Sequence, residues 1–210
     1  MNLANKLTVF RMILVPVFVI IGYLGTFGVI TGEFLGIPMA LILMNVIFII
    51  ASITDKLDGY IARSRNQITT FGKFLDPLAD KILVLSALVM LVEYGKIPGW
   101  IPVVVLAREF IVSGYRMLEA EKGGKVVAAS IWGKLKTATT MVAIIIVFFD
   151  KFNFCSFLTT PMTVLEYVIN ITSSILMIVS VVATIFSGYD YLKNGKDLFK
   201  DAKNKYIIRK

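Results

Sequence analysis

The chain alternates long apolar runs with short segments that collect its charged residues. Three runs, residues 12–32, 34–54 and 167–189, contain no Asp, Glu, Lys or Arg. Each is longer than about 18 residues, the length at which an apolar helix can span a bilayer. When spans interrupted by charges are included, we predict six helices, at about 8–24, 38–62, 71–94, 98–118, 128–149 and 164–189. Segments rich in Gly or Pro separate several of them.

Composition supports a membrane protein. Of the 210 residues, 57% are hydrophobic, and a soluble domain of this size requires more polar surface. The apolar stretch after Arg11 is too long for the hydrophobic region of a signal peptide, so we expect the first helix to remain in the protein. The sequence therefore predicts an all-α, polytopic membrane protein in which residues 1–210 form one domain with six transmembrane helices.

Lys and Arg are unevenly distributed among the predicted connections. Of the 22 cationic residues, the connections after the first, third and fifth helices hold only Lys96 and Lys151. The positive-inside rule therefore predicts a multi-pass protein of the cell membrane with both termini in the cytoplasm. Residues 190–210 are strongly basic, with Tyr191 and Leu192 among their interleaved apolar positions. This pattern predicts an interfacial helix on anionic lipid, and we expect a lipid partner rather than nucleic acid.

Four aspartates lie where the second and third predicted helices approach the cytoplasmic side. Asp55 and Asp58 are three residues apart and Asp76 and Asp80 are four apart, so each pair projects from one helix face. Charges inside spans are costly and normally face a polar cavity. Four carboxylates that converge there would repel one another unless cations neutralised them.

The chain has no histidine and a single cysteine, Cys155, so carboxylates must perform any acid–base or metal chemistry. Sites made only of oxygen ligands suit Mg²⁺, Mn²⁺ or Ca²⁺. Two such ions would form a two-metal site for displacement at phosphorus. Gly59 and Gly72 lie beside the aspartates and would allow close approach of a phosphate or nucleoside, or close packing of helices.

Residues 55–80 resemble the signature of the CDP-alcohol phosphotransferases, D-x2-D-G-x2-A-R-x8-G-x3-D-x3-D. All eight fixed positions are present at the signature's spacing. The resemblance implies the family's six-helix membrane fold, a CDP-activated lipid as the donor substrate, and a homodimer.

The resemblance also implies individual roles. Asp55, Asp58 and Asp76 would hold two Mg²⁺ or Mn²⁺ ions, and Asp80 would lie near the second ion and act as general base toward the acceptor hydroxyl. The residues implied to bind the CDP-lipid are Asn5, Thr8, Arg11, Gly59, Arg63, Thr69 and Gly72. Asn5 and Thr8 have an alternative role, because either residue type can cap a helix.

A second group of cations lies on the predicted fourth and fifth helices: Arg108, Arg116, Lys134 and Lys136. Guanidinium and ammonium groups suit a phosphate dianion, which favours an acceptor with its own phosphate. Positive-inside topology and contact with lipid headgroups offer another explanation. Residues 107–116 and 133–137 resemble segments of the family's branch that uses sn-glycerol 3-phosphate, and this likeness extends from Asn5 to about Thr140. It implies transfer of a phosphatidyl group from CDP-diacylglycerol to sn-glycerol 3-phosphate.

Three alternatives remain at this point. The acceptor could instead be inositol phosphate, serine or phosphatidylglycerol. A divalent-ion transporter would also place acids within the membrane, although a carrier is expected to have polar groups near the midplane and on both sides. A purely structural membrane protein gives no reason for four aspartates at this spacing.

Overall fold

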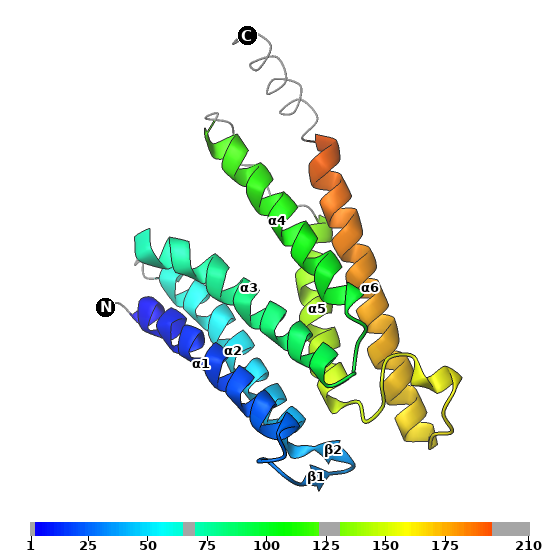
Figure 1. The fold of residues 1–210 in the computed structure, drawn as a ribbon. Helices are drawn as coiled ribbons and strands as arrows, with labels where there is room; N and C mark the ends of the chain where they lie inside the picture. The colour runs from blue at the N-terminus through cyan, green and yellow to red at the C-terminus, as the bar shows by residue number, and fades with distance from the viewer. Residues whose placement is uncertain (1–2, 65–69, 122–130, 195–210) are drawn as a thin grey trace, which may run out of the picture. The chain divides into compact units, whose positions relative to one another are not determined.

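The computed structural model describes residues 3–64, 70–121 and 131–194 and is helical apart from one small hairpin (Figure 1). The elements are α1 (Leu3–Thr26), β1 (Glu33–Phe34), β2 (Ile37–Pro38), α2 (Met39–Ser64), α3 (Thr70–Glu93), α4 (Trp100–Glu121), α5 (Ile131–Phe149), the short 3₁₀ helix η1 (Ser156–Leu158) and α6 (Val164–Asn194). Within these ranges the α-helices lie where the apolar runs predict them.

Two predicted helix ends are wrong. α1 begins at Leu3 rather than near residue 8, so Asn5 and Thr8 lie inside the helix and do not cap it. α6 continues to Asn194, so no separate segment begins at residue 190, and Tyr191 is buried rather than at a lipid interface. The predicted spans ended where charged and polar residues begin, but both helices continue through those residues. The rest of the predicted tail, residues 195–210, lies outside the described residues.

The hairpin between α1 and α2 is an element that the hydrophobic pattern did not predict. Its strands are antiparallel and pair Glu33 with Pro38 and Phe34 with Ile37. Leu35 and Gly36 form the turn with φ values of 55° and 76°, the positive values that a type I′ turn requires at both central positions. Strands of two residues are too short to show alternation in a sequence.

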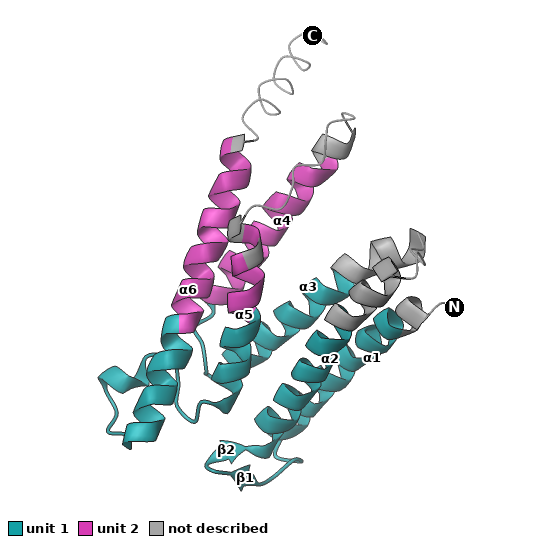
Figure 2. Ribbon diagram, turned by 180° about the vertical axis from the view of Figure 1, so that it is seen from behind, with its two compact units in different colours: residues 1–99, 141–175 teal, residues 100–140, 176–210 magenta. Residues whose placement is uncertain are grey.

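The chain forms two compact units (Figure 2). Unit 1 contains residues 1–99 and 141–175, and unit 2 contains residues 100–140 and 176–210. α5 and α6 each contribute to both units, whereas α1 to α3 belong to unit 1 and α4 belongs to unit 2.

In unit 1, α1 packs against α2 and α3, which lie beside it (Figure 1). Gly25 permits this approach, because a Cβ atom there would collide with Ala40 on α2 and with the hydroxyl of Tyr94. The Tyr94 hydroxyl also donates a hydrogen bond to the Gly22 carbonyl oxygen at 2.8 Å. The unit is closed by Phe148 of α5, whose ring meets the Phe18 ring edge-to-face at a centroid distance of 6.0 Å. α1 is therefore held on two sides by contacts that tolerate little change.

A buried lysine joins the loops of unit 1 that follow α3 and α5. Lys96 is only 6% exposed. Its Nζ donates to the backbone carbonyl oxygens of Asp150 and Lys151 at 2.9 and 2.8 Å, and to that of Phe152 at 3.4 Å. These carbonyls directly follow the last residue of α5, where the helix dipole places partial negative charge. Lys96 therefore caps α5 from another loop.

The carboxylate of Asp150 completes this group, which we term the loop cluster (Lys96, Asp150, Asn170 and Ser173). Asp150 Oδ2 accepts hydrogen bonds from Asn170 Nδ2 at 2.8 Å and from Ser173 Oγ at 2.5 Å, and Oδ1 accepts one from the Phe152 amide at 2.9 Å. Burial lowers the pKa of Lys96, and the nearby Asp150 carboxylate acts in the opposite direction. The loop cluster fixes the start of α6 to the ends of α3 and α5.

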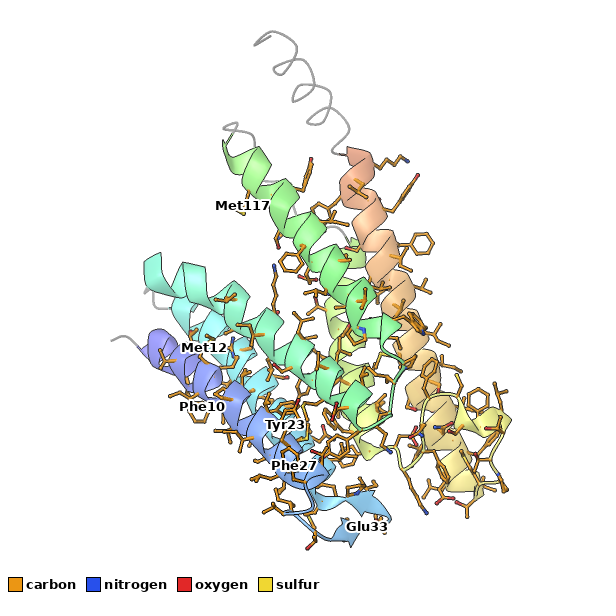
Figure 3. The ribbon with its side chains drawn as sticks, in the orientation of Figure 1. Phe10, Met12, Tyr23, Phe27, Glu33 and Met117 are labelled. Atoms are coloured by element: carbon orange, nitrogen blue, oxygen red, sulfur yellow. The ribbon has the colours of Figure 1, made fainter. Side chains whose placement is uncertain are left out.

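Large apolar side chains remain exposed on the helices. Phe10 and Phe27 on or just after α1 are 45% and 77% exposed, and Met117 on α4 is 74% exposed (Figure 3). Among the described residues, Leu7–Thr26 and Val164–Lys193 are long and apolar enough to cross a membrane. Exposed apolar surface on such helices is typical of contact with lipid.

Candidate active site

The four aspartates of the predicted metal site lie on two helices. Asp55 and Asp58 lie on α2, and Asp76 and Asp80 lie on α3, both in unit 1. The side chains of Asp55 and Asp80 are described, and both are partly buried. The other predicted site residues of this region fall outside the described side chains: Asn5, Asp58, Gly59, Arg63, Gly72 and Asp76, with Thr69 outside the described backbone as well.

α1 contributes an arginine to this region. Arg11 is fully buried, and its Nη1 lies 2.6 Å from Asp55 Oδ1, while the Asp55 side chain is 31% exposed. An ion pair of this length is a strong, charge-assisted contact. It orients one oxygen of a predicted metal ligand and offsets part of its charge. The family resemblance implies that Arg11 binds the CDP-lipid, and the contact with Asp55 was not predicted from the sequence.

The donor chemistry of the region fits a hard divalent cation. Asp55 and Asp80 offer only carboxylate oxygens, the ligands that Mg²⁺ and Mn²⁺ prefer. The chain has no histidine, and its one cysteine, Cys155, lies in the loop between α5 and α6. Among the residues whose side chains are described, no three His, Cys, Asp or Glu residues lie close enough together to hold an ion. The four-aspartate metal site therefore stays a prediction.

Unit 2 contains all four predicted acceptor-binding cations. We use the term basic cluster for Arg108, Arg116 and Lys136; the side chain of Lys134, the fourth predicted residue, lies outside the described set. Arg108 and Lys136 both contact the carboxylate of Glu109: Arg108 Nη1 donates to Glu109 Oε1 at 2.9 Å, and Lys136 Nζ donates to the same oxygen. Arg108 Nη2 also donates to Ser187 Oγ of α6. α4, α5 and α6 thus meet at this group.

Arg116 has a different partner on α6. Its Nη2 donates to the hydroxyl of Tyr191 at 2.7 Å, and its guanidinium lies 5.5 Å from the centre of the Tyr191 ring. The Arg108 guanidinium lies 5.8 Å from the same ring. Tyr191 is 4% exposed and packs with Val112 and Tyr115 of α4. Arg116 itself is solvent-exposed, so it remains accessible to an anion.

Two residues of this group, Ser187 and Tyr191, were not predicted from the sequence. They are four residues apart and therefore share one face of α6. That spacing was available in the sequence, but Tyr191 had been assigned to the lipid-facing tail. The contacts with Arg108 and Arg116 span 79 and 75 residues of sequence, which no local pattern reveals.

Relatives resemble this chain along nearly its full length. One from Bacillus subtilis (strain 168), named CDP-diacylglycerol–glycerol-3-phosphate 3-phosphatidyltransferase, is 39% identical over 201 residues, which are 95% of this chain and 97% of the relative. Proteins with the same name from Haemophilus influenzae and Rickettsia bellii are 36% and 34% identical. They cover 95% and 94% of this chain, and the matches span 96% and 97% of their own lengths.

The family comparison agrees with the signature at residues 55–80. The sequence profile described as CDP-alcohol phosphatidyltransferase matches residues 1–186, which include parts of both units. This match, together with the apolar helices, indicates a helical membrane protein. The resemblance drawn from eight fixed positions is confirmed: this chain belongs to the CDP-alcohol phosphatidyltransferase family.

Proposed function

We propose that this chain is an enzyme that transfers the phosphatidyl group of CDP-diacylglycerol to sn-glycerol 3-phosphate, with release of CMP. The observation that carries the proposal is that three relatives with this one enzyme name align with 94–95% of the chain. The alignment therefore includes the α4–α5 region, whose cations favour an acceptor that carries a phosphate.

The donor site is proposed on unit 1. Asp55, Asp58 and Asp76 would hold two Mg²⁺ or Mn²⁺ ions, with Asp80 near the second, and the ions when bound would offset the charge of the donor's diphosphate. The residues proposed to bind the CDP-lipid are Asn5, Thr8, Arg11, Gly59, Arg63, Thr69 and Gly72. Thr8 and Arg11 are buried within unit 1. We therefore expect Arg11 to act on the donor through Asp55, with which it pairs.

Asp80 is proposed as the general base. It would accept the proton of the attacking glycerol hydroxyl as that oxygen forms a bond to the β-phosphorus, which bears the diacylglycerol. The bond between this phosphorus and the oxygen that bridges to CMP would break, and CMP would leave with the electron pair. Asp80 is partly buried on α3 beside the fully buried Ala79. This packing would hold its backbone in place beneath the proposed site.

The acceptor phosphate is proposed to bind Arg108, Arg116, Lys134 and Lys136. Glu109 offsets one of the three charges in the basic cluster through its contacts with Arg108 and Lys136. The described part of the cluster then keeps two positive charges, which matches a phosphate dianion. A neutral or zwitterionic acceptor such as serine would leave that excess without a partner.

The proposed enzyme is a multi-pass protein with six transmembrane helices, both termini in the cytoplasm, and a homodimeric assembly. The uneven distribution of Lys and Arg supports the orientation. The exposed apolar side chains on α1, α4 and α6 support burial in lipid or against a second copy of the chain.

An acceptor screen tests the reaction. Purified full-length protein in detergent micelles with CDP-diacylglycerol and Mg²⁺ or Mn²⁺ should release CMP with sn-glycerol 3-phosphate and with no other acceptor at a comparable rate. Activity only with inositol phosphate, serine or phosphatidylglycerol would replace the acceptor and keep the family chemistry. Divalent-ion flux into proteoliposomes without CMP release would favour the transporter.

The role of Asp80 has a separate test. Asp80→Asn keeps the size of the side chain and removes its basicity, so turnover should fall at least about a hundredfold. Binding of CDP-diacylglycerol, measured by equilibrium binding to the same detergent-solubilised protein, should change little. Near-normal turnover by this variant would exclude Asp80 as the base.

A further inference from the structure

Tyr191 places one aromatic ring beside both arginines of the basic cluster. Arg108 and Arg116 are eight residues apart, so they lie two turns apart on the same side of α4. Their guanidinium carbons lie 5.8 and 5.5 Å from the centre of the Tyr191 ring. The face of an aromatic ring attracts cations within about 6 Å. The ring therefore offsets the repulsion between two like charges that share one site.

The hydroxyl of Tyr191 adds direction to this contact. It accepts a hydrogen bond from Arg116 Nη2 at 2.7 Å. Arg116 is exposed, and an exposed arginine loses considerable side-chain freedom when it binds an anion. A partner that fixes one of its nitrogens in advance reduces that loss and leaves other N–H groups for a ligand.

Packing alone does not explain a tyrosine at this position. The contact of Tyr191 with Val112 and Tyr115 is made by the ring, with a centroid distance of 6.0 Å between the two tyrosine rings. A phenylalanine would make the same contact. Among the described residues, the hydroxyl has Arg116 as its partner, and Arg116 is not itself a core residue.

We propose that Tyr191 is a positioning residue for the acceptor phosphate: it fixes Arg116 and holds Arg116 and Arg108 together. α6 thereby takes part in recognising the acceptor. This inference rests on the proposed function, because it assumes that the acceptor carries a phosphate and binds the basic cluster.

The test is steady-state kinetics of Tyr191→Phe in the full-length protein, in micelles with CDP-diacylglycerol. Loss of the charge-assisted hydrogen bond should raise KM for sn-glycerol 3-phosphate about tenfold. KM for CDP-diacylglycerol and kcat should change less than about twofold, since Tyr191 is proposed to contact neither donor nor reacting atoms. Tyr189→Phe is the matched control: Tyr189 is 61% exposed on the same helix and should retain the wild-type KM.

A double-mutant cycle separates positioning from a general structural role. If Tyr191 acts through Arg116, the effect of Tyr191→Phe on KM should disappear in an Arg116→Ala background. Equal effects in both backgrounds, an unchanged KM, or a loss confined to kcat would overturn the inference while the wild-type reaction stands. If the wild type uses another phosphorylated acceptor, the same prediction applies to that KM. Activity only with an acceptor that lacks phosphate would overturn both the inference and the proposed function.

Discussion

Replacing Lys96 by methionine should destabilise the fold without disabling the chemistry. Methionine preserves the apolar stem and removes the ammonium group that caps α5. The carbonyls of Asp150 and Lys151, at 2.9 and 2.8 Å from Nζ, would lose their donor. Asp150 would also lose a nearby opposite charge.

The size of the effect follows from these contacts. A buried polar group left unsatisfied costs about 1–3 kcal/mol, and two carbonyls are affected. The variant no longer has to bury a charged ammonium group, whose desolvation lowers the pKa of Lys96, and this gain offsets part of the loss. We therefore expect the free energy of unfolding to fall by about 2–4 kcal/mol, which is about 4–16 °C in Tm for a chain of this size.

The chain carries its own reporter for this measurement. Cys155 is the single cysteine, it lies in the loop that Lys96 secures, and its amide donates to Ser174 Oγ of α6 at 3.0 Å. A thiol-reactive fluorescent dye should therefore label Lys96→Met at a lower temperature than the wild type.

Lys151→Met provides the control, because Lys151 is exposed and pairs with Glu166 at 3.3 Å, and a solvent-exposed ion pair contributes little to stability. Equal melting of the two variants would refute the proposed cap. CMP release below the melting temperature should be retained, because Asp80 and the end of α3 at Glu93 are about 20 Å apart along the helix.

Three other contacts and the titration of Lys96 each make a further prediction. Asp55→Ala should destabilise the protein by about 3 kcal/mol, because it removes the carboxylate partner of the buried Arg11. Arg11→Met should cost about 1 kcal/mol or less. A lower melting temperature for Arg11→Met than for Asp55→Ala would contradict this prediction. Gly25→Ala should lower the free energy of unfolding by about 1–3 kcal/mol, because Ala40 and Tyr94 occupy the space of the new methyl group. Gly114→Ala is the control, because a Cβ atom at Gly114 meets no atom within 4 Å. It should be neutral or stabilising by up to about 1 kcal/mol. Arg116→Ala should raise KM for sn-glycerol 3-phosphate about thirtyfold or more, which is a larger effect than that of Tyr191→Phe. KM for CDP-diacylglycerol should be nearly unchanged. A selective loss of donor binding would instead assign Arg116 to the donor site. The pKa of Lys96 is below its usual 10.5 in the folded state, so between the folded-state pKa and 10.5 the unfolded chain binds more protons than the folded chain. The stability of the wild type relative to Lys96→Met should therefore rise as the pH increases toward 10.5. Tm values of both proteins measured at several pH values test this, and a difference that falls with pH would contradict it.

The sequence predicts the helices well because their dominant signal is local. Runs without charge, such as residues 12–32, specify a span regardless of what packs against it. The family could also be recognised locally, because its aspartate signature lies within 26 residues. The ends of α1 and α6 were misplaced because charged residues were taken as boundaries.

The contacts that a local pattern cannot show are those of charged residues with distant partners. Lys96 was assigned to a loop, yet it binds carbonyls 54 to 56 residues away. Arg11 was read as a ligand of the CDP-lipid, yet it pairs with Asp55. In each case the residue type was informative, but its partner was set by the packing of helices, which neither periodicity nor spacing encodes.

The loop cluster also bears on how the chain is oriented in a membrane. In the proposed topology Lys96 and Lys151 lie on the outer side, where an inside-negative potential opposes the export of positive charge by about 2.3 kcal/mol per charge at 100 mV. Lys96 lies near Asp150, and Lys151 pairs with Glu166. In that topology each of the two cations would cross the membrane with a nearby acid, and this set of four would carry no net charge. Moving these four groups together across the membrane would therefore need little work against the membrane potential, which is consistent with two lysines on the outer side of the proposed topology.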